Sequence, residues 1–142
     1  MHYHRPPDRT PGTFLKAALI NAALVGSGGF IGAIFRYGLS GFVQRSTPLS
    51  TFPYGTLAVN MAGCLLIGIV VGLVESRQLF GPEVRLFLMI GVLGGFTTYS
   101  TFGYETFGLL RDGDFLRALV NVGIHVVLGL ALLWAGYTVT TR

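Results

Sequence analysis

The stretch GVLGGFTTYSTFGYE, residues 91–105, combines two properties that conflict in a single regular helix. It overlaps a charge-free window, residues 86–104, whose length of about 20 residues suits a helix that crosses a bilayer. Its middle, however, carries the pair Gly94 and Gly95 followed by four hydroxyl residues, Thr97, Thr98, Ser100 and Thr101. Paired glycines and hydroxyl side chains permit a helix to break, and a broken transmembrane helix exposes carbonyls that can coordinate a cation. We therefore expect a broken membrane span here, with a Gly/Ser/Thr packing face as the alternative.

Similar windows recur along the chain. Only 11% of the residues are charged, against about 25% in an average soluble domain. The four charge-free windows are 17–35, 46–74, 86–104 and 118–141. All six prolines lie outside the helices that we expect there, which are 17–43, 55–74, 84–109 and 115–139. The sequence therefore predicts an all-α integral membrane protein with four transmembrane helices.

Little of the chain remains outside these helices. Residues 1–16 show no apolar periodicity and are expected to form a flexible N-terminal tail, which leaves 17–142 as the transmembrane domain. A cleaved signal peptide is an alternative for the first window, although such segments usually have only about 7–15 apolar residues. No soluble catalytic domain fits, so an enzyme is not expected. The basic residues behind the net charge of +4 are scattered rather than gathered in a stripe, which indicates membrane flanks and no nucleic-acid partner.

Glycines at four-residue spacing predict close helix packing. The pairs are Gly28/Gly32, Gly68/Gly72 and Gly91/Gly95, within a total of 21 glycines. Small residues at this spacing let helix backbones approach each other in lipid. Because four helices scarcely surround an aqueous path, we also expect at least a dimer.

Polar side chains within the expected spans are the candidate functional groups, because each one is costly in lipid. Arg36 follows the glycines of the first helix, and it either extends to the headgroups or draws anions into a vestibule. Thr56 and Asn60 share one face of the second helix. Asn60 either joins two helices or offers its two uncharged donors to a small passing anion.

Aromatic residues accompany the hydroxyl cluster of the third helix. Tyr99 and Phe102 lie near one helix face, and aromatic ring edges are positive enough to accompany an anion through an apolar region, although core packing is the ordinary role of such rings. On the fourth helix, Asn121 and His125 form a stripe with Gly129. An interhelical hydrogen bond suits His125 better than a proton relay.

Three motifs on successive helices resemble the Fluc/CrcB family of fluoride channels. They are GGFIGAIFRY at 28–37, GTLAVNMAG at 55–63 and GGFTTYSTFGYE at 94–105. The resemblance implies a fluoride-specific channel of the inner (plasma) membrane that lowers cytoplasmic fluoride by passive efflux. It also implies an antiparallel, dual-topology dimer with two pores and one structural sodium ion that is not transported.

The resemblance also assigns roles to individual residues. Backbone carbonyls of Gly94 and Thr97 would bind the sodium ion. The fluoride path would be lined by Asn60, by Tyr99 and Phe102 as the paired aromatics, by the hydroxyls of Thr56, Ser100 and Thr101, and by Arg36 near a vestibule. Glu105 matches the acid that closes the third motif, without an assigned role. Tyr99 stands where the family usually has Phe, and Asn121 and His125 stand where it commonly has Tyr and Ser.

Two other functions are compatible with four short helices. A small multidrug or guanidinium exporter needs an acidic residue in its first span, and residues 17–35 contain none. A non-conducting scaffold subunit would have no use for polar residues along a path.

Loop charges bear on assembly. Six basic residues lie on the side of the N-terminus (Arg5, Arg9, Lys16, Arg77, Arg85 and Arg142) and four on the other side (Arg36, Arg45, Arg111 and Arg117). Without Arg5 and Arg9 of the tail, the two sides balance. Because orientation follows the cytoplasmic excess of Lys and Arg, this balance favours insertion both ways and a homodimer. A pair with a homologous subunit is the alternative.

Overall fold

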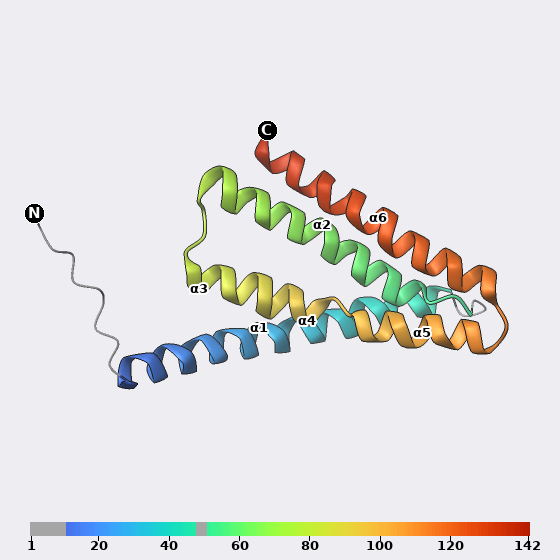
Figure 1. The fold of residues 1–142 in the computed structure, drawn as a ribbon, viewed down its shortest axis with the longest axis horizontal. Helices are drawn as coiled ribbons and strands as arrows, with labels where there is room; N and C mark the ends of the chain where they lie inside the picture. Colours follow the sequence, from blue (N-terminus) through green and yellow to red (C-terminus); the bar gives the residue numbers. More distant parts are fainter. Residues whose placement is uncertain (1–10, 48–50) are drawn as a thin grey trace, which may run out of the picture.

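The chain forms four helices of membrane-spanning length, as Figure 1 shows for a computed structural model that describes residues 11–47 and 51–142. The elements are α1 Pro11–Ser46, α2 Tyr54–Arg77, α3 Pro82–Arg85, the π-helix η1 Leu86–Leu93, α4 Gly94–Phe96, α5 Tyr99–Arg111 and α6 Phe115–Thr141. The elements from α3 to α5 make up the third span, Pro82–Arg111. The expected all-α fold with four spans and an interrupted third helix is therefore confirmed.

The ends of the helices follow proline chemistry. Pro82 occupies the first position of a helix, where the missing N–H needs no partner, and Pro53 precedes α2. Within the described residues α1 runs from Pro11, so residues 11–16 are helical where the sequence led us to expect a tail. The remainder of that expected tail, residues 1–10, lies outside the described residues.

Two helix pairs build the domain, and glycines set their separation. In Figure 1, α6 runs beside α2, and α1 runs beside the third span. A Cβ atom on Gly28 would lie 2.6 Å from the Phe87 carbonyl oxygen, and one on Gly95 would lie 2.6 Å from the Gly29 carbonyl oxygen. A Cβ on Gly68 would meet the Leu133 carbonyl of α6 in the same way. The expected role of the glycine pairs in close packing is confirmed.

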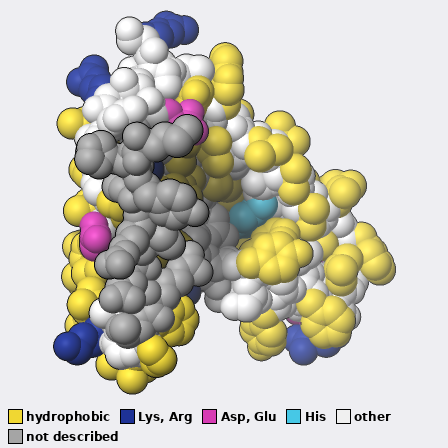
Figure 2. Space-filling view, turned by 60° about the vertical axis from the view of Figure 1, so that its left-hand side comes forward, with side chains coloured by type: hydrophobic (Ala, Val, Ile, Leu, Met, Phe, Trp, Pro, Cys, Tyr) yellow, Lys and Arg dark blue, Asp and Glu magenta, His cyan; other side chains and the backbone are white. Residues whose placement is uncertain are grey.

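The outer surface is largely apolar. Figure 2 shows hydrophobic side chains over much of one face, and large hydrophobic residues are exposed on every long helix. Most helix faces that point outward therefore suit lipid or another protein chain rather than water.

Candidate functional site

The third span breaks at two threonines. Thr97 (φ −80°, ψ 160°) and Thr98 (φ −150°, ψ 116°) have extended backbones between α4 and α5. Thr98 then caps α5, because its hydroxyl oxygen accepts a hydrogen bond from the Thr101 backbone N–H at 3.3 Å. The break and the new helix start are thus encoded by neighbouring hydroxyl residues.

Asn60 of α2 forms hydrogen bonds with the backbone of Thr98, where the third span is interrupted. Its Oδ1 accepts from the Thr98 N–H at 2.9 Å, and its Nδ2 donates to the Thr98 carbonyl oxygen at 3.2 Å. One amide side chain therefore replaces the helical acceptor of the Thr98 N–H and adds a second donor to the Thr98 carbonyl, which as the N-cap of α5 also accepts the first bond of that helix. Of the two Nδ2 hydrogens, the second has no partner in the hydrogen bonds of the described residues.

The same interruption frees carbonyl groups. In a continuous helix, the Thr98 N–H would be donated to the Gly94 carbonyl and the Thr101 N–H to the Thr97 carbonyl. Both donors are used elsewhere, on Asn60 Oδ1 and on Thr98 Oγ1. The Gly94 and Thr97 carbonyls are therefore left without their helical donors, and such oxygens suit a hard cation such as sodium.

A first cavity, which we call the arginine cavity, has a volume of about 360 Å³ and lies between α1, α2 and the start of α5. Its polar lining comes from Arg36, Ser40, Thr56, Thr98 and Thr101. Arg36 is half-buried and has no ion-pair partner among the described residues. Its guanidinium therefore faces a hydroxyl-rich space with its charge uncompensated by a carboxylate there.

Glu105 does not line the arginine cavity itself but is hydrogen-bonded to Thr56, which does. The Thr56 hydroxyl, only 4% exposed, donates to Glu105 Oε1 at 2.7 Å. Oε2 is buried without a hydrogen-bond partner among the described residues. The acid at the end of the third motif is thus placed against α2, and it does not pair with Arg36.

A second cavity, the aromatic cavity, has a volume of about 380 Å³ and is lined by both Asn60 and Thr98. Its lining includes Asn60, Thr98, Tyr99, Phe102 and His125, together with sulfur-containing and aliphatic side chains. The ring centroids of Tyr99 and Phe102 are 5.6 Å apart, and those of Phe102 and His125 are 4.4 Å apart. Three rings thus form a row along one wall.

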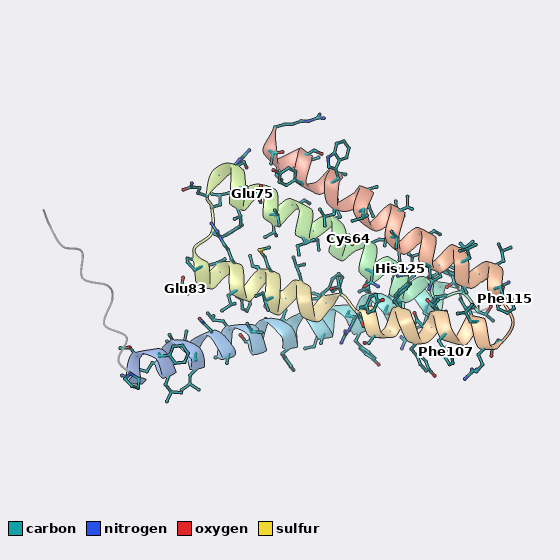
Figure 3. All side chains as sticks on the ribbon, viewed as in Figure 1. Cys64, Glu75, Glu83, Phe107, Phe115 and His125 are labelled. Carbon is teal, nitrogen blue, oxygen red and sulfur yellow. The ribbon has the colours of Figure 1, made fainter. Side chains whose placement is uncertain are left out.

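A hydrogen-bonded chain supports this row from α5 and α6. The Thr106 hydroxyl donates to the Phe102 carbonyl at 2.7 Å, and Asn121 Nδ2 donates to the Thr106 oxygen at 2.9 Å. His125 Nδ1 lies 2.9 Å from the Asn121 carbonyl oxygen. Figure 3 shows His125 on α6, where this helix passes α2 and the start of α5.

The structure brings together most residues singled out from the sequence. Thr56, Thr101 and Arg36 line the arginine cavity, and Asn60, Tyr99 and Phe102 line the aromatic cavity. Ser100 lines neither of these cavities, although its hydroxyl lies 3.3 Å from that of Thr98. Tyr99 is 85% exposed, so much of its ring lies outside the single chain.

Three features were missed by sequence reasoning. Thr98 was read only as one hydroxyl among four, although a threonine three residues before another polar helix residue is a recognisable helix cap. Thr106, buried behind Phe102, gave no signal because a single threonine in a span is unremarkable. The sulfur atoms of Met61 and Cys64 in the aromatic cavity were likewise not anticipated.

Comparisons with known proteins identify the family of the chain. The model of a family described as CrcB-like protein, Camphor Resistance (CrcB), matches residues 23–137. A fluoride-specific ion channel FluC of Nitratidesulfovibrio vulgaris (strain Miyazaki F) is 46% identical over 113 residues, which are 80% of this chain and 90% of the relative. Another FluC, from Geobacter sulfurreducens, is 49% identical over 108 residues, which are 76% of this chain and 86% of the relative. FluC 1 of Methanosarcina acetivorans is 45% identical over 113 residues, which are 80% of this chain and 85% of the relative.

Proposed function

The chain belongs to the CrcB family, and from this membership and the two cavities we propose that it is a fluoride-specific ion channel. It is a multi-pass membrane protein and not an enzyme. Its physiological role is passive fluoride efflux across the inner (plasma) membrane, which lowers cytoplasmic fluoride. The observation that carries the proposal is that Thr98 lines both the anion-attracting arginine cavity and the largely apolar aromatic cavity.

The two cavities would contribute to fluoride conduction in different ways. Arg36 raises the local concentration of anions in the arginine cavity, where hydroxyls of Thr56 and Thr101 can replace water around fluoride. The free Nδ2 hydrogen of Asn60 is an uncharged donor that can bind a small anion and release it. In the aromatic cavity, ring edges accompany the anion with weak interactions only.

Fluoride efflux from liposomes that contain only this protein tests the function. Purified protein should release trapped fluoride, measured with a fluoride electrode, and should reject chloride strongly because the route is narrow and offers neutral donors. Robust chloride current would contradict the proposal. Absence of any ion flux would favour a non-conducting subunit, and proton-coupled guanidinium transport would favour an exporter, although α1 contains no acidic residue.

A structural sodium ion would fit the break in the third span. The Gly94 and Thr97 carbonyls lack their helical donors, whereas the Thr97 hydroxyl is already donated to the Leu93 carbonyl at 3.0 Å. The backbone, rather than the side chain, would therefore hold the ion. Two oxygens do not complete a coordination sphere, so we infer that a second subunit supplies the others.

Replacement of sodium and two substitutions test this site. Flux should fall when sodium is exchanged for a large organic cation. Thr97→Ala should be mild, because the carbonyl remains, and Gly94→Leu should be severe, because a bulky side chain would crowd the ligand oxygens. Equal losses in both variants would argue against carbonyl ligands.

Antiparallel assembly of two copies would cover the exposed ring of Tyr99 and complete the sodium site. The balanced loop charges favour a self-sufficient, dual-topology homodimer over a pair with a homologous subunit. Accessibility tags at both termini of the chain expressed alone test this. A single orientation, with fluoride flux only after addition of a homologous subunit, would show that the chain is half of a pair.

A further inference from the structure

The first part of α1 extends past the start of the third span. Gly28 of α1 lies beside Phe87 and Gly32 lies beside Val92, so α1 and the third span run in the same direction. Every residue from 11 to 23 is exposed, and the first half-buried residue of α1 is Leu24. At about 1.5 Å per residue, residues 11–23 form a helical segment about 20 Å long, which we call the N-terminal arm. Figure 1 shows the arm continuing past α3.

Charged side chains mark where the apolar core of the bilayer ends on this side of the molecule. Arg77 is the last residue of α2, and Glu83 and Arg85 belong to α3 at the start of the third span. Because charged groups are costly in hydrocarbon, their level lies at or outside the edge of the core. The N-terminal arm continues beyond this level and is therefore not needed to cross the bilayer.

The N-terminal arm carries most of its large apolar side chains on one face. The residues that share this face, at spacings i, i+1, i+4, i+5 and i+8, are Phe14, Leu15, Ala18, Leu19 and Ala22. Phe14 is 76% exposed and Leu15 is 59% exposed, so the described part of the chain leaves this face largely uncovered. Lys16 lies off the face, together with Ile20. An arm that stood upright in water would therefore expose an apolar surface at a cost in free energy.

The dimensions and the charge of the arm favour a lipid surface as its partner. Each headgroup layer is only about 5–8 Å thick, so an arm about 20 Å long fits within it when the arm runs along the surface. Lys16 is the one charged residue of the arm, and a basic residue beside an apolar face suits the phosphate groups of anionic lipids. The match to the CrcB family begins at residue 23, so the arm lies outside the matched residues.

The sequence that joins the arm to the packed part of α1 allows a bend. A Cβ atom on Gly26 would have no neighbour within 4 Å, and the Ser27 hydroxyl donates to the Leu24 carbonyl oxygen at 3.1 Å. Glycine next to serine, and a serine hydroxyl bonded to a carbonyl of its own helix, both favour helix bending. A bend here turns the arm onto the membrane surface and leaves Gly28 in contact with η1.

We propose that the N-terminal arm is a lipid-binding segment that lies along the membrane surface. Phe14, Leu15 and Leu19 lie at the boundary between headgroups and acyl chains, and Lys16 binds the phosphates of anionic lipids. The arm thereby anchors the start of α1 in the headgroup layer. None of the residues of the proposed fluoride path belongs to the arm, so this inference does not depend on the ion that the chain conducts.

Tryptophan fluorescence of the full chain in vesicles of phosphatidylcholine and phosphatidylglycerol tests the position of the arm. Trp134→Phe removes the single native tryptophan, and a new one is placed on the apolar face by Ala18→Trp or off this face by Ala17→Trp. Lipids brominated in the upper part of their acyl chains should quench the Ala18→Trp variant at least about twofold more than its matched control. Both positions are exposed and precede the first half-buried residue of α1, so neither substitution disturbs the helix bundle.

Three other results would overturn the inference. Equal quenching of the two variants would show that the arm has no side turned toward the acyl chains. Quenching by aqueous iodide, without quenching by lipid, would place the apolar face in water. Protection of Ala18→Trp from both quenchers would show that protein covers this face, either a second copy or another partner.

Lys16→Gln tests the recognition of anionic lipid. This substitution should raise the fraction of phosphatidylglycerol that gives half-maximal quenching of the Ala18→Trp variant about twofold or more. Arg142→Gln removes a basic residue on the same side of the membrane but outside the arm, and this matched control should leave that fraction unchanged. An unchanged fraction in Lys16→Gln, or an equal shift in Arg142→Gln, would overturn the role of Lys16 in lipid binding.

Discussion

The arginine cavity and the aromatic cavity share Thr98 in their linings, yet their walls differ in chemistry. One wall carries a guanidinium and several hydroxyls, and the other carries three rings, one of them an imidazole, and sulfur-containing side chains. Attraction of an anion from water needs a permanent positive charge, whereas rapid passage needs groups that bind weakly. The contrast indicates that capture and passage are assigned to different cavities.

The largest effect is expected at Asn60, which is bonded to Thr98, the residue that lines both cavities. In Asn60→Asp, the carboxylate cannot donate to the Thr98 carbonyl, and its charge repels fluoride. A lost hydrogen bond costs about 0.5–1.5 kcal/mol, and the repulsion adds to this, so flux should fall about a hundredfold or more. Liposome efflux measures the loss.

A matched control is available at the end of α2. Gln78→Glu makes the same change from amide to carboxylate at an exposed position that lies outside the four spans and lines neither cavity. This variant should keep its flux within about threefold of wild type. Unchanged flux in a folded Asn60→Asp protein would instead assign Asn60 to helix packing alone.

The next largest effect is expected at Gly95, where the third span packs closely against α1. A Cβ on Gly95 would lie 2.6 Å from the Gly29 carbonyl oxygen, whereas a Cβ on Gly94 would lie 3.7 Å from its nearest neighbour, the Met89 carbonyl oxygen. Gly95→Ala should therefore lower the stability by about 1–3 kcal/mol, and Gly94→Ala by much less. Thermal unfolding in detergent, followed by the fluorescence of the single Trp134, measures both variants. Equal stabilities would contradict the packing described for α1.

The arginine cavity alone is altered by Arg36→Gln. Flux should fall about tenfold at low ionic strength, and the difference should shrink as salt screens the charge. Arg45→Gln, on the same helix but outside the cavity lining, is the control. A loss in Arg36→Gln that does not depend on salt would indicate a packing role for this side chain.

The smallest effect is expected at Ser100, and it tests which side of α5 lines the fluoride path. Ser100 lines neither cavity, so Ser100→Ala should change flux by less than about twofold, within the usual range for surface substitutions. Thr101→Val removes a hydroxyl that does line the arginine cavity, and its effect should be several times larger. The reverse order would move the fluoride path to the Ser100 side of α5.

The candidate site was predictable only in part. Arg36, Thr56 and Asn60 stood out from the sequence because polar side chains within the expected spans are costly in lipid, and Tyr99 and Phe102 stood out because they accompany the hydroxyl cluster of the third span. The partners of these residues could not be predicted from the sequence, since the hydrogen bond from Thr56 to Glu105, for example, joins residues 49 positions apart. The role of Thr98 could not be singled out either, because the neighbouring residues Thr97, Ser100 and Thr101 carry the same kind of hydroxyl side chain.

The sequence by itself determined the four spans and the break in the third. These are local properties, because hydrophobic length and a Gly/Thr cluster act within a short stretch of the chain. The tertiary structure alone decided that Asn60 bonds both peptide groups of Thr98, that the polar residues divide between two cavities, and that His125 lies against Phe102. These outcomes depend on which helix faces meet, and that depends on the backbone contacts that Gly28 and Gly95 allow.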